Sequence, residues 1–278
     1  MPTIEPKSVL LATLVGVTVV FIAFWSRASL RHLGIGLLTN FFDTLGIGSF
    51  ATTTTLFRLW KLVPDEKIPG TLNIGHALPT VAQALIYITI IQVDLQTLVL
   101  LILSAVGGSW IGAAVVAGLP RSAIQRGMGF ALLVAAVLMV MTAIDQFPGG
   151  GDALVLTQGR LILGCAINFA LGALMTLGIG LYAPCMIMVS LLGMNPTAAY
   201  PIMMGSCAFL MPVAGAQFIR KARYDVRAAV GLAIGGIPGV LIAALIVQAL
   251  PLAYVRWLVV VVVIYAAVSL LRSAHSRE

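Results

Sequence analysis

Charged side chains are scarce in this chain: of its 278 residues, 60% are hydrophobic and only 9% are charged. Soluble proteins carry about 25% charged residues, so this composition excludes an ordinary soluble domain and indicates an integral membrane protein. The apolar stretches reach the ~20 residues that a helix needs to span a bilayer. They lack the residue-by-residue alternation of an outer-membrane barrel, so we expect an all-α polytopic membrane protein.

Cysteines are also few. Cys165, Cys185 and Cys207 all lie in apolar segments, which argues against a disulfide framework. The sequence contains no nucleotide-binding motif, and we expect no cofactor and no bound metal. The net charge of +7 comes from Lys and Arg residues in short loops, where orientation in a lipid bilayer explains it better than a nucleic-acid partner.

The apolar segments predict seven full transmembrane helices. The first lies within residues 1–32, and because bulky Phe24 and Trp25 precede Arg27 in place of a cleavage site, we expect this helix to be retained. Two further segments, Leu33–Trp60 and Arg160–Met194, are apolar but broken by glycines. The predicted spans are Ser8–Ser26, Gly70–Ile91, Leu95–Leu119, Gly127–Gln146, Tyr200–Ile219, Val226–Ala249 and Leu252–Leu271.

One pentapeptide occurs twice. Thr44–Gly48 and Thr176–Gly180 both read Thr-Leu-Gly-Ile-Gly and lie 132 positions apart. Further matches at this spacing, or with one residue of gap, are Pro69 with Pro201, Asn73 with Gly205, Asp94 with Asp225, and Pro120 with Pro251. We therefore expect an internal duplication, with repeat 1 in residues 33–146, a linker in 147–159 and repeat 2 in 160–278.

The basic residues decide how the broken segments lie, because Lys and Arg accumulate on the cytoplasmic side of a membrane. If both segments are re-entrant hairpins and the N-terminus is outside, 13 basic residues lie inside and 3 outside. If both segments cross the membrane, the ratio is 9 to 7. The hairpin arrangement is strongly favoured. It leaves outside only Lys7, Arg160 and Arg256, and places the C-terminus in the cytoplasm.

This topology makes each repeat one hairpin plus three full spans. An odd number of spans inverts the second repeat relative to the first, so the hairpins enter from opposite faces and their tips approach near the midplane. Inverted repeats of this kind are common among secondary transporters. Irregular backbone at that depth is tolerated only where it is buried in protein or lines a cavity.

The hairpin tips supply the candidate binding site. A half-helix that begins near Gly48 presents unpaired N–H groups and a partial positive charge, which favour an anion. Pro184 suits the first turn of the corresponding half-helix. The alternative is that the glycines only allow close helix packing. The candidate substrate-binding residues are Thr44, Gly46, Gly48, Ser49, Thr52, Asn73, His76, Thr176, Gly178, Gly180, Tyr182, Ser206 and Cys207.

Asp43 is the only acidic residue well inside an apolar segment, where a charge is costly. Since an ionised carboxylate would repel an anionic substrate, one hypothesis is that Asp43 is protonated during part of the cycle and couples transport to protons. It is alternatively a cation site, or the cap of a half-helix. For His76 a structural role is an equal alternative, and Cys185 and Cys207 are either thiol groups that meet a sulfur compound or small apolar fillers.

The two copies of Leu-Gly-Ile-Gly, each followed by a proline-led helix, resemble the sulfite exporter TauE/SafE family, the 4-toluene sulfonate uptake permeases. The resemblance covers about Leu33 to Leu271. It implies a transporter of small sulfur-containing or organic anions, such as sulfite, sulfonates or thiosulfate, in the bacterial inner membrane, driven by an ion gradient. Where that family continues with more glycines, this chain has Ser49 and Phe50 after Gly48.

Two other functions are considered. Ser49 and His76 are the residue types of a Ser–His dyad, as in an intramembrane serine protease. That function leaves the duplicated break unexplained, because the second copy has no serine at this position. The other alternative is a channel or a cation-coupled transporter of another solute, with Asp43 as the cation site.

Overall fold

The computed structural model describes residues 29–45, 47–144, 146, 150–178 and 180–246, with six positions between 264 and 274. Within these residues the chain is mostly helical, and its only β-pairing is one bridge between Ala153 and Met194. Five described helices are long and apolar enough to cross a membrane, which confirms an all-α membrane-embedded protein. The predicted span Ser8–Ser26, most of Leu252–Leu271 and Gly46 lie outside the described residues.

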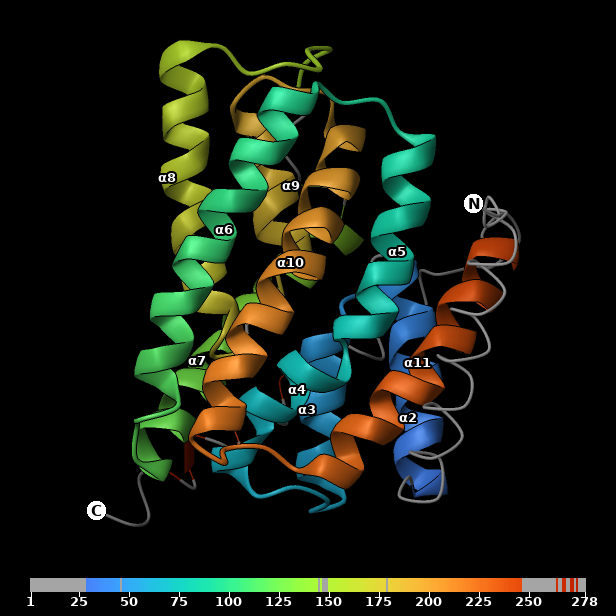
Figure 1. Cartoon of the computed structure of the whole chain (residues 1–278), viewed down its shortest axis with the longest axis vertical. Coiled ribbons are helices and arrows are strands. Elements are labelled where there is room, and N and C mark those ends of the chain that lie inside the picture. The colour runs from blue at the N-terminus through green and yellow to red at the C-terminus, as the bar shows by residue number, and fades with distance from the viewer. Residues whose placement is uncertain are drawn as a thin grey trace, which may run out of the picture.

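The described helices are joined mostly by short connections (Figure 1). In chain order the elements are α2 (Leu30–Thr44), α3 (Ser49–Leu59), η1 (Asp65–Lys67), α4 (Ile68–Gly75), α5 (Ala77–Ile90), α6 (Leu95–Val116), α7 (Arg121–Ala143), α8 (Gln158–Met175), α9 (Tyr182–Leu191), η2 (Pro196–Ala198), α10 (Ala199–Arg220) and α11 (Val226–Ile246).

The span predicted at Gly70–Ile91 is two helices, because α4 ends at Gly75 and α5 begins at Ala77. Pro79 explains the break. It has no N–H to donate to the carbonyl of Gly75, and its ring crowds that carbonyl. His76 lies at the junction and is fully buried. A second difference concerns α8, which was predicted as part of a hairpin and is itself long and apolar enough to cross a membrane.

The buried carboxylate of Asp65 connects several segments at one end of the molecule, which we call the Asp65 end. Its carboxylate is 3% exposed and accepts two hydrogen bonds from Arg58, at 2.6 and 2.7 Å, and one from Gln125 at 2.7 Å. Arg121 lies 3.3 Å from the same carboxylate. These contacts tie the end of α3 to the start of α7, so both lie at the Asp65 end.

The opposite end, called the Asp94 end, is held by its loops. The Asp94 N–H donates to the Leu154 carbonyl at 3.0 Å, and the Gly151 N–H donates to the Met194 carbonyl at 3.0 Å. The connections after α5, α7 and α9 therefore meet here. Asp94 also caps α6, because its carboxylate accepts hydrogen bonds from the N–H and the hydroxyl of Thr97. These two bonds to Thr97 lower the pKa of the Asp94 carboxyl.

Helices α2 and α3 form a hairpin that opens toward the Asp65 end. α2 packs in parallel with α11, as successive close approaches advance along both helices: His32 with Gly231, Leu33 with Gly235, and Leu37 with Gly239. The Asp225 N–H, just before α11, donates to the hydroxyl of Thr71 in α4, which directly follows the Asp65 segment. α11 therefore starts at the Asp65 end, and so does α2. α3 then returns there, because Arg58 reaches Asp65. Figure 1 shows α2 and α11 side by side.

Helices α8 and α9 form a second hairpin, which opens toward the Asp94 end. α8 packs in parallel with α6, where Gly108 meets Phe169 and Gly112 meets Ala173. α6 begins at the Asp94 end, and so does α8. α9 returns to that end, where Arg160 donates to the carbonyl of Leu192. The two hairpins thus open toward opposite ends of the molecule (Figure 1).

The contact between α6 and α8 depends on Gly108, and we expect Gly108→Ala to destabilise the protein. A Cβ at this position would overlap the carbonyl oxygen of Phe169, so the helices must separate, at a cost of about 1–3 kcal/mol. Gly107→Ala is the matched control, since its nearest neighbour is the Phe169 ring at 3.5 Å. Thermal unfolding of the purified protein in detergent measures both, and equal melting temperatures would contradict this packing.

Candidate functional site

The two helix breaks meet at one internal cavity of about 30 Å³, which has room for about two water molecules. The remaining wall comes from α5, through Thr80, and from one face of α10. The hairpins contribute four pairs of lining residues, each 132 positions apart in the sequence: Asp43 with Met175, Gly48 with Gly180, Ser49 with Leu181, and Phe50 with Tyr182.

The backbone confirms a break in each hairpin. Between α2 and α3, Gly48 has φ +81°, and between α8 and α9, Gly178 has φ +100°. Both values lie in the region that favours glycine. The return arms α3 and α9 have 11 and 10 residues, so each rises roughly 15 Å, about half of a ~30 Å hydrocarbon layer. Each break therefore lies roughly 15 Å from the end toward which its hairpin opens.

The carboxylate of Asp43 caps the half-helix α3. Its Oδ1 accepts the Ser49 N–H at 2.7 Å, and its Oδ2 accepts from Nε2 of Gln83 at 3.1 Å. The side chain is 8% exposed and lines the cavity. The capping role considered for Asp43 is thus present. It places a carboxylate where an external anion would meet the N-terminus of α3.

Thr80 brings a polar group that has no partner. Its side chain is 1% exposed and lines the cavity, and none of the described residues forms a hydrogen bond with its hydroxyl oxygen. Oε1 of Gln83 likewise has no hydrogen-bond partner among the described residues. A buried polar atom without a partner costs about 1–3 kcal/mol. The Thr80 hydroxyl is therefore available to a molecule that enters the cavity, and Oε1 of Gln83, which lies outside the lining, is available to a rearranged side chain.

Three tyrosines connect the hairpins. The hydroxyl groups of Tyr182 and Tyr200 lie 3.0 Å apart, and the rings of Tyr200 and Tyr87 stack with centroids 5.0 Å apart. Tyr87 then donates to the carbonyl of Thr44 at 2.7 Å. The tip of the second hairpin is thereby linked through α10 and α5 to the break of the first.

His76 belongs to a separate buried network. Its Nε2 lies 3.0 Å from the hydroxyl of Thr53, and its Nδ1 lies 3.0 Å from Oδ1 of Asn40. All three side chains have no exposed surface, and none lines the cavity. Both ring nitrogens are therefore engaged away from Ser49, so the Ser49–His76 dyad of a protease is not formed in this structure. The arrangement matches the structural role considered for His76.

The predicted site residues divide into two groups. The structure brings to the cavity Asp43, Gly48, Ser49, Gly180, Tyr182 and Cys207. Asn168 separately donates to the buried hydroxyl of Ser206, and Thr52 donates back to the carbonyls of its own helix. The other predicted residues that the structure describes lie outside the lining: Thr44, Thr52, Asn73, His76, Thr176, Gly178 and Ser206.

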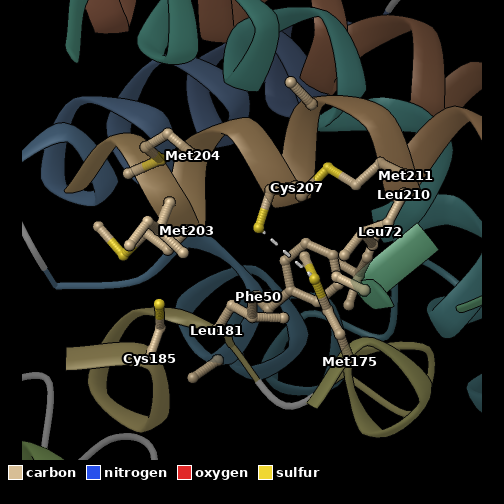
Figure 2. Packing of buried hydrophobic residues seen from close by; sticks show 14 of the residues in the cluster. Phe50, Leu72, Met175, Leu181, Cys185, Met203, Met204, Cys207, Leu210 and Met211 are labelled. Atoms are coloured by element: carbon tan, nitrogen blue, oxygen red, sulfur yellow. Dashed lines mark hydrogen bonds between the residues drawn. The ribbon is translucent and has the colours of Figure 1, made fainter. Parts of the chain in front are cut away.

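The sequence reasoning missed most of the apolar wall. Four methionines line the cavity, three of them from α10 (Figure 2). The spacing of Met203, Cys207 and Met211, at i, i+4 and i+8, is the available signal, because it places them on one helix face. The residues missed altogether are Phe50, Thr80, Met175, Leu181, Met203, Met204 and Met211.

Comparisons with protein-family models, with curated proteins and with solved structures found no match to this chain. The geometry of the cavity and the pattern of the sequence are therefore what bear on its function.

Two threonine variants test whether the hydroxyl of Thr53, which contacts His76, and that of Thr80, which has no partner among the described residues, contribute to stability. Thr53→Val leaves a buried nitrogen of His76 without a partner, so we expect a loss of about 1–3 kcal/mol of stability. Thr80→Val removes a hydroxyl that has no partner among the described residues, so we expect an unchanged or higher melting temperature. The purified proteins are compared by thermal unfolding in detergent. Equal destabilisation by both variants would show that Thr80 has a structural partner.

Proposed function

We propose that this protein is a secondary membrane transporter that holds a small anion between its two hairpin tips. The observation that carries this proposal is the cavity itself. Residues from two breaks 132 positions apart line it in four matched pairs, and the hairpins open toward opposite ends. A pocket reached from both sides by equivalent elements is what alternating access requires.

The same geometry supports two inverted repeats with re-entrant hairpins. The long arm of each hairpin packs in parallel on a helix of the other half, α2 on α11 and α8 on α6. These two pairs correspond to one another under the spacing of the repeat. In this proposal the Asp65 end faces the cytoplasm of a bacterial cell, and seven spans accompany the hairpins.

The cavity suits a small anion through backbone groups. The first N–H groups of α3 and α9 lack partners within their helices, although Asp43 accepts that of Ser49, and no atom lies within 4 Å of where a Cβ would stand on Gly48 or Gly180. The hydroxyls of Ser49 and Thr80 add donors. The resemblance to the TauE/SafE family supports sulfite, a sulfonate or thiosulfate as the substrate. Since the cavity now has room only for water, the tips must separate to admit it.

Asp43 provides the coupling to protons in this proposal. Protonation removes the charge that repels an anion, and it creates a donor that needs an acceptor. Gln83 supplies one: its Nε2 now donates to Asp43, while its Oε1 is unpartnered. A half-turn of the amide presents Oε1 to the protonated carboxyl and gives up the hydrogen bond that Nε2 now donates to the Thr44 hydroxyl. The pair therefore has two hydrogen-bonded arrangements, one for each protonation state.

A cation-coupled transporter or a channel for another solute is the second candidate, and one observation favours it. Asp43 is the only charged side chain among the described residues that line the cavity. An ionised carboxylate without a fixed basic partner attracts a cation. The flux experiment described below distinguishes this function from anion transport.

Cysteine labelling from one side of the membrane tests the topology. Lys61→Cys and Lys221→Cys both change exposed residues at the Asp65 end, whereas Asp152→Cys lies in the loop at the Asp94 end. We expect an impermeant maleimide to label the first two from the cytoplasmic side only. The third should react from outside only, because α2–α3 and α8–α9 return to the ends they enter from. Labelling of Lys61→Cys and Lys221→Cys from opposite sides would contradict the hairpins.

Flux in proteoliposomes tests substrate and coupling together. We expect the wild-type protein to accumulate sulfite or a sulfonate when a pH gradient is imposed. Asp43→Asn keeps an acceptor for the Ser49 N–H but cannot ionise, so it should exchange substrate without responding to the gradient. The measurement is initial uptake at several internal and external pH values.

The control for this experiment is Asp152→Asn, which changes an exposed loop carboxylate and should behave as wild type. A wild-type pH dependence in Asp43→Asn would refute proton coupling through this residue. Uptake driven by a metal-cation gradient, with no anion flux, would instead establish the second candidate. Loss of all binding in a correctly folded Asp43→Asn protein would assign Asp43 to the substrate site.

A further inference from the structure

The cavity is unusually rich in sulfur. Five of its thirteen lining residues are methionine or cysteine, whereas only 14 of the 278 residues in the chain are of these types. Met203, Cys207 and Met211 lie one turn apart on α10, and Met175 faces them from the end of α8 (Figure 2). Met128, Met188, Met194 and Cys185 are buried in the core outside the lining as well. What distinguishes the cavity is that its sulfur side chains come from two facing elements, α10 and the end of α8.

Two of these sulfur atoms are spaced as metal ligands. The thiol of Cys207 donates a hydrogen bond to Sδ of Met175, with the two sulfur atoms 3.6 Å apart, and Figure 2 draws this contact as a dashed line. Two sulfur ligands at about 2.3 Å from a tetrahedral metal ion lie roughly 3.8 Å apart. A metal ion bound to both atoms would lie to one side of the line that joins them, and it would replace the hydrogen bond between them.

The types of donor decide which metal fits. Among the described residues no group of three or more His, Cys, Asp or Glu side chains could hold a metal ion, which argues against a structural zinc site. Thioether and thiolate sulfur instead select soft ions such as Cu(I). Met203 and Met211 flank Cys207 on the same face of α10, and their flexible thioethers would have to turn toward the ion to complete its coordination.

We propose that the cavity binds one soft monovalent metal cation of the Cu(I) and Ag(I) class through Cys207 and Met175. On binding, a metal–sulfur bond forms, the S–H bond of Cys207 breaks, and its proton leaves to the solvent. No electron is transferred. The thiolate neutralises the charge of the cation, so the loaded site carries no net charge beyond that of Asp43, which lies in the same wall. This site does not depend on the proposed anion transport.

The other cysteines serve as internal comparisons. Cys185 is as deeply buried as Cys207, but it lies outside the cavity lining and its Sγ is 4.0 Å from the carbonyl of Ala199. Cys165 is half-buried on α8, also outside the lining. If a buried thiol alone were sufficient to bind the metal ion, Cys185 would bind it as well as Cys207 does. The proposed site predicts that Cys185 does not bind the metal ion.

Silver titration of the purified full-length protein tests the site, with Ag(I) as a stand-in for Cu(I) that is stable to oxidation. We expect one tightly bound Ag(I) per chain, as measured by calorimetry and by metal analysis after desalting. Cys207→Ser should weaken binding by at least about tenfold, and Met175→Leu, which keeps the volume of the side chain, by several-fold. Binding should strengthen as the pH rises, because the thiol loses a proton.

The controls are Cys185→Ser and Cys165→Ser, which should bind like the wild-type protein. All variants are compared by thermal unfolding first, and Met175→Leu keeps the test decisive if Cys207→Ser does not fold. X-ray absorption of the Cu(I)-loaded protein should show sulfur neighbours at about 2.3 Å. Wild-type affinity in both Cys207→Ser and Met175→Leu would overturn the proposal. So would equal loss in Cys185→Ser, or a copper shell of oxygen or nitrogen only.

Discussion

A helix that begins in the interior, away from water, leaves backbone N–H groups without partners, and this constraint governs the centre of the protein. Both hairpins stop and restart their helices roughly 15 Å from the end toward which they open. In the first, the carboxylate of Asp43 accepts the Ser49 N–H. In the second, Met175 stands at the corresponding position and offers no strong acceptor. The two tips share a break in the backbone but differ in the group that satisfies it.

Glycine contacts determine where those tips lie. Because the α2–α11 and α6–α8 contacts bring backbone against backbone at Gly235 and Gly108, neither pair has room to slide without separating. Each pair joins the hairpin of one half to a helix of the other half, and each is expected to move as a unit. The surfaces between the pairs, which include the cavity and the stacked rings of Tyr87 and Tyr200, are then where opening can occur.

The sequence predicted the parts of this site that are repeated along the chain. A duplicated pentapeptide marks both breaks, and Gly48, Gly180 and Asp43 all reach the cavity. What it did not predict depends on contacts between helices. Neither Asn73 nor His76 lines the cavity. Pro79 breaks the helix at His76, and the His76 ring contacts the hydroxyl of Thr53 instead. No local pattern reports such a contact.

The lining methionines were not predicted for a related reason. A methionine on a helix face indicates only apolar packing until the surface that it faces is known. The partner surface here contains a carboxylate, and that changes what the wall can do. With Asp43 ionised, the charge in the cavity is negative and the sulfur atoms of Cys207 and Met175 favour a soft cation. With Asp43 protonated, the cavity is neutral and the N-termini of α3 and α9 favour an anion. The two proposals together imply that one proton decides the sign of the ion that the cavity prefers, and the unpartnered oxygen of Gln83 is an acceptor that the protonated carboxyl would need.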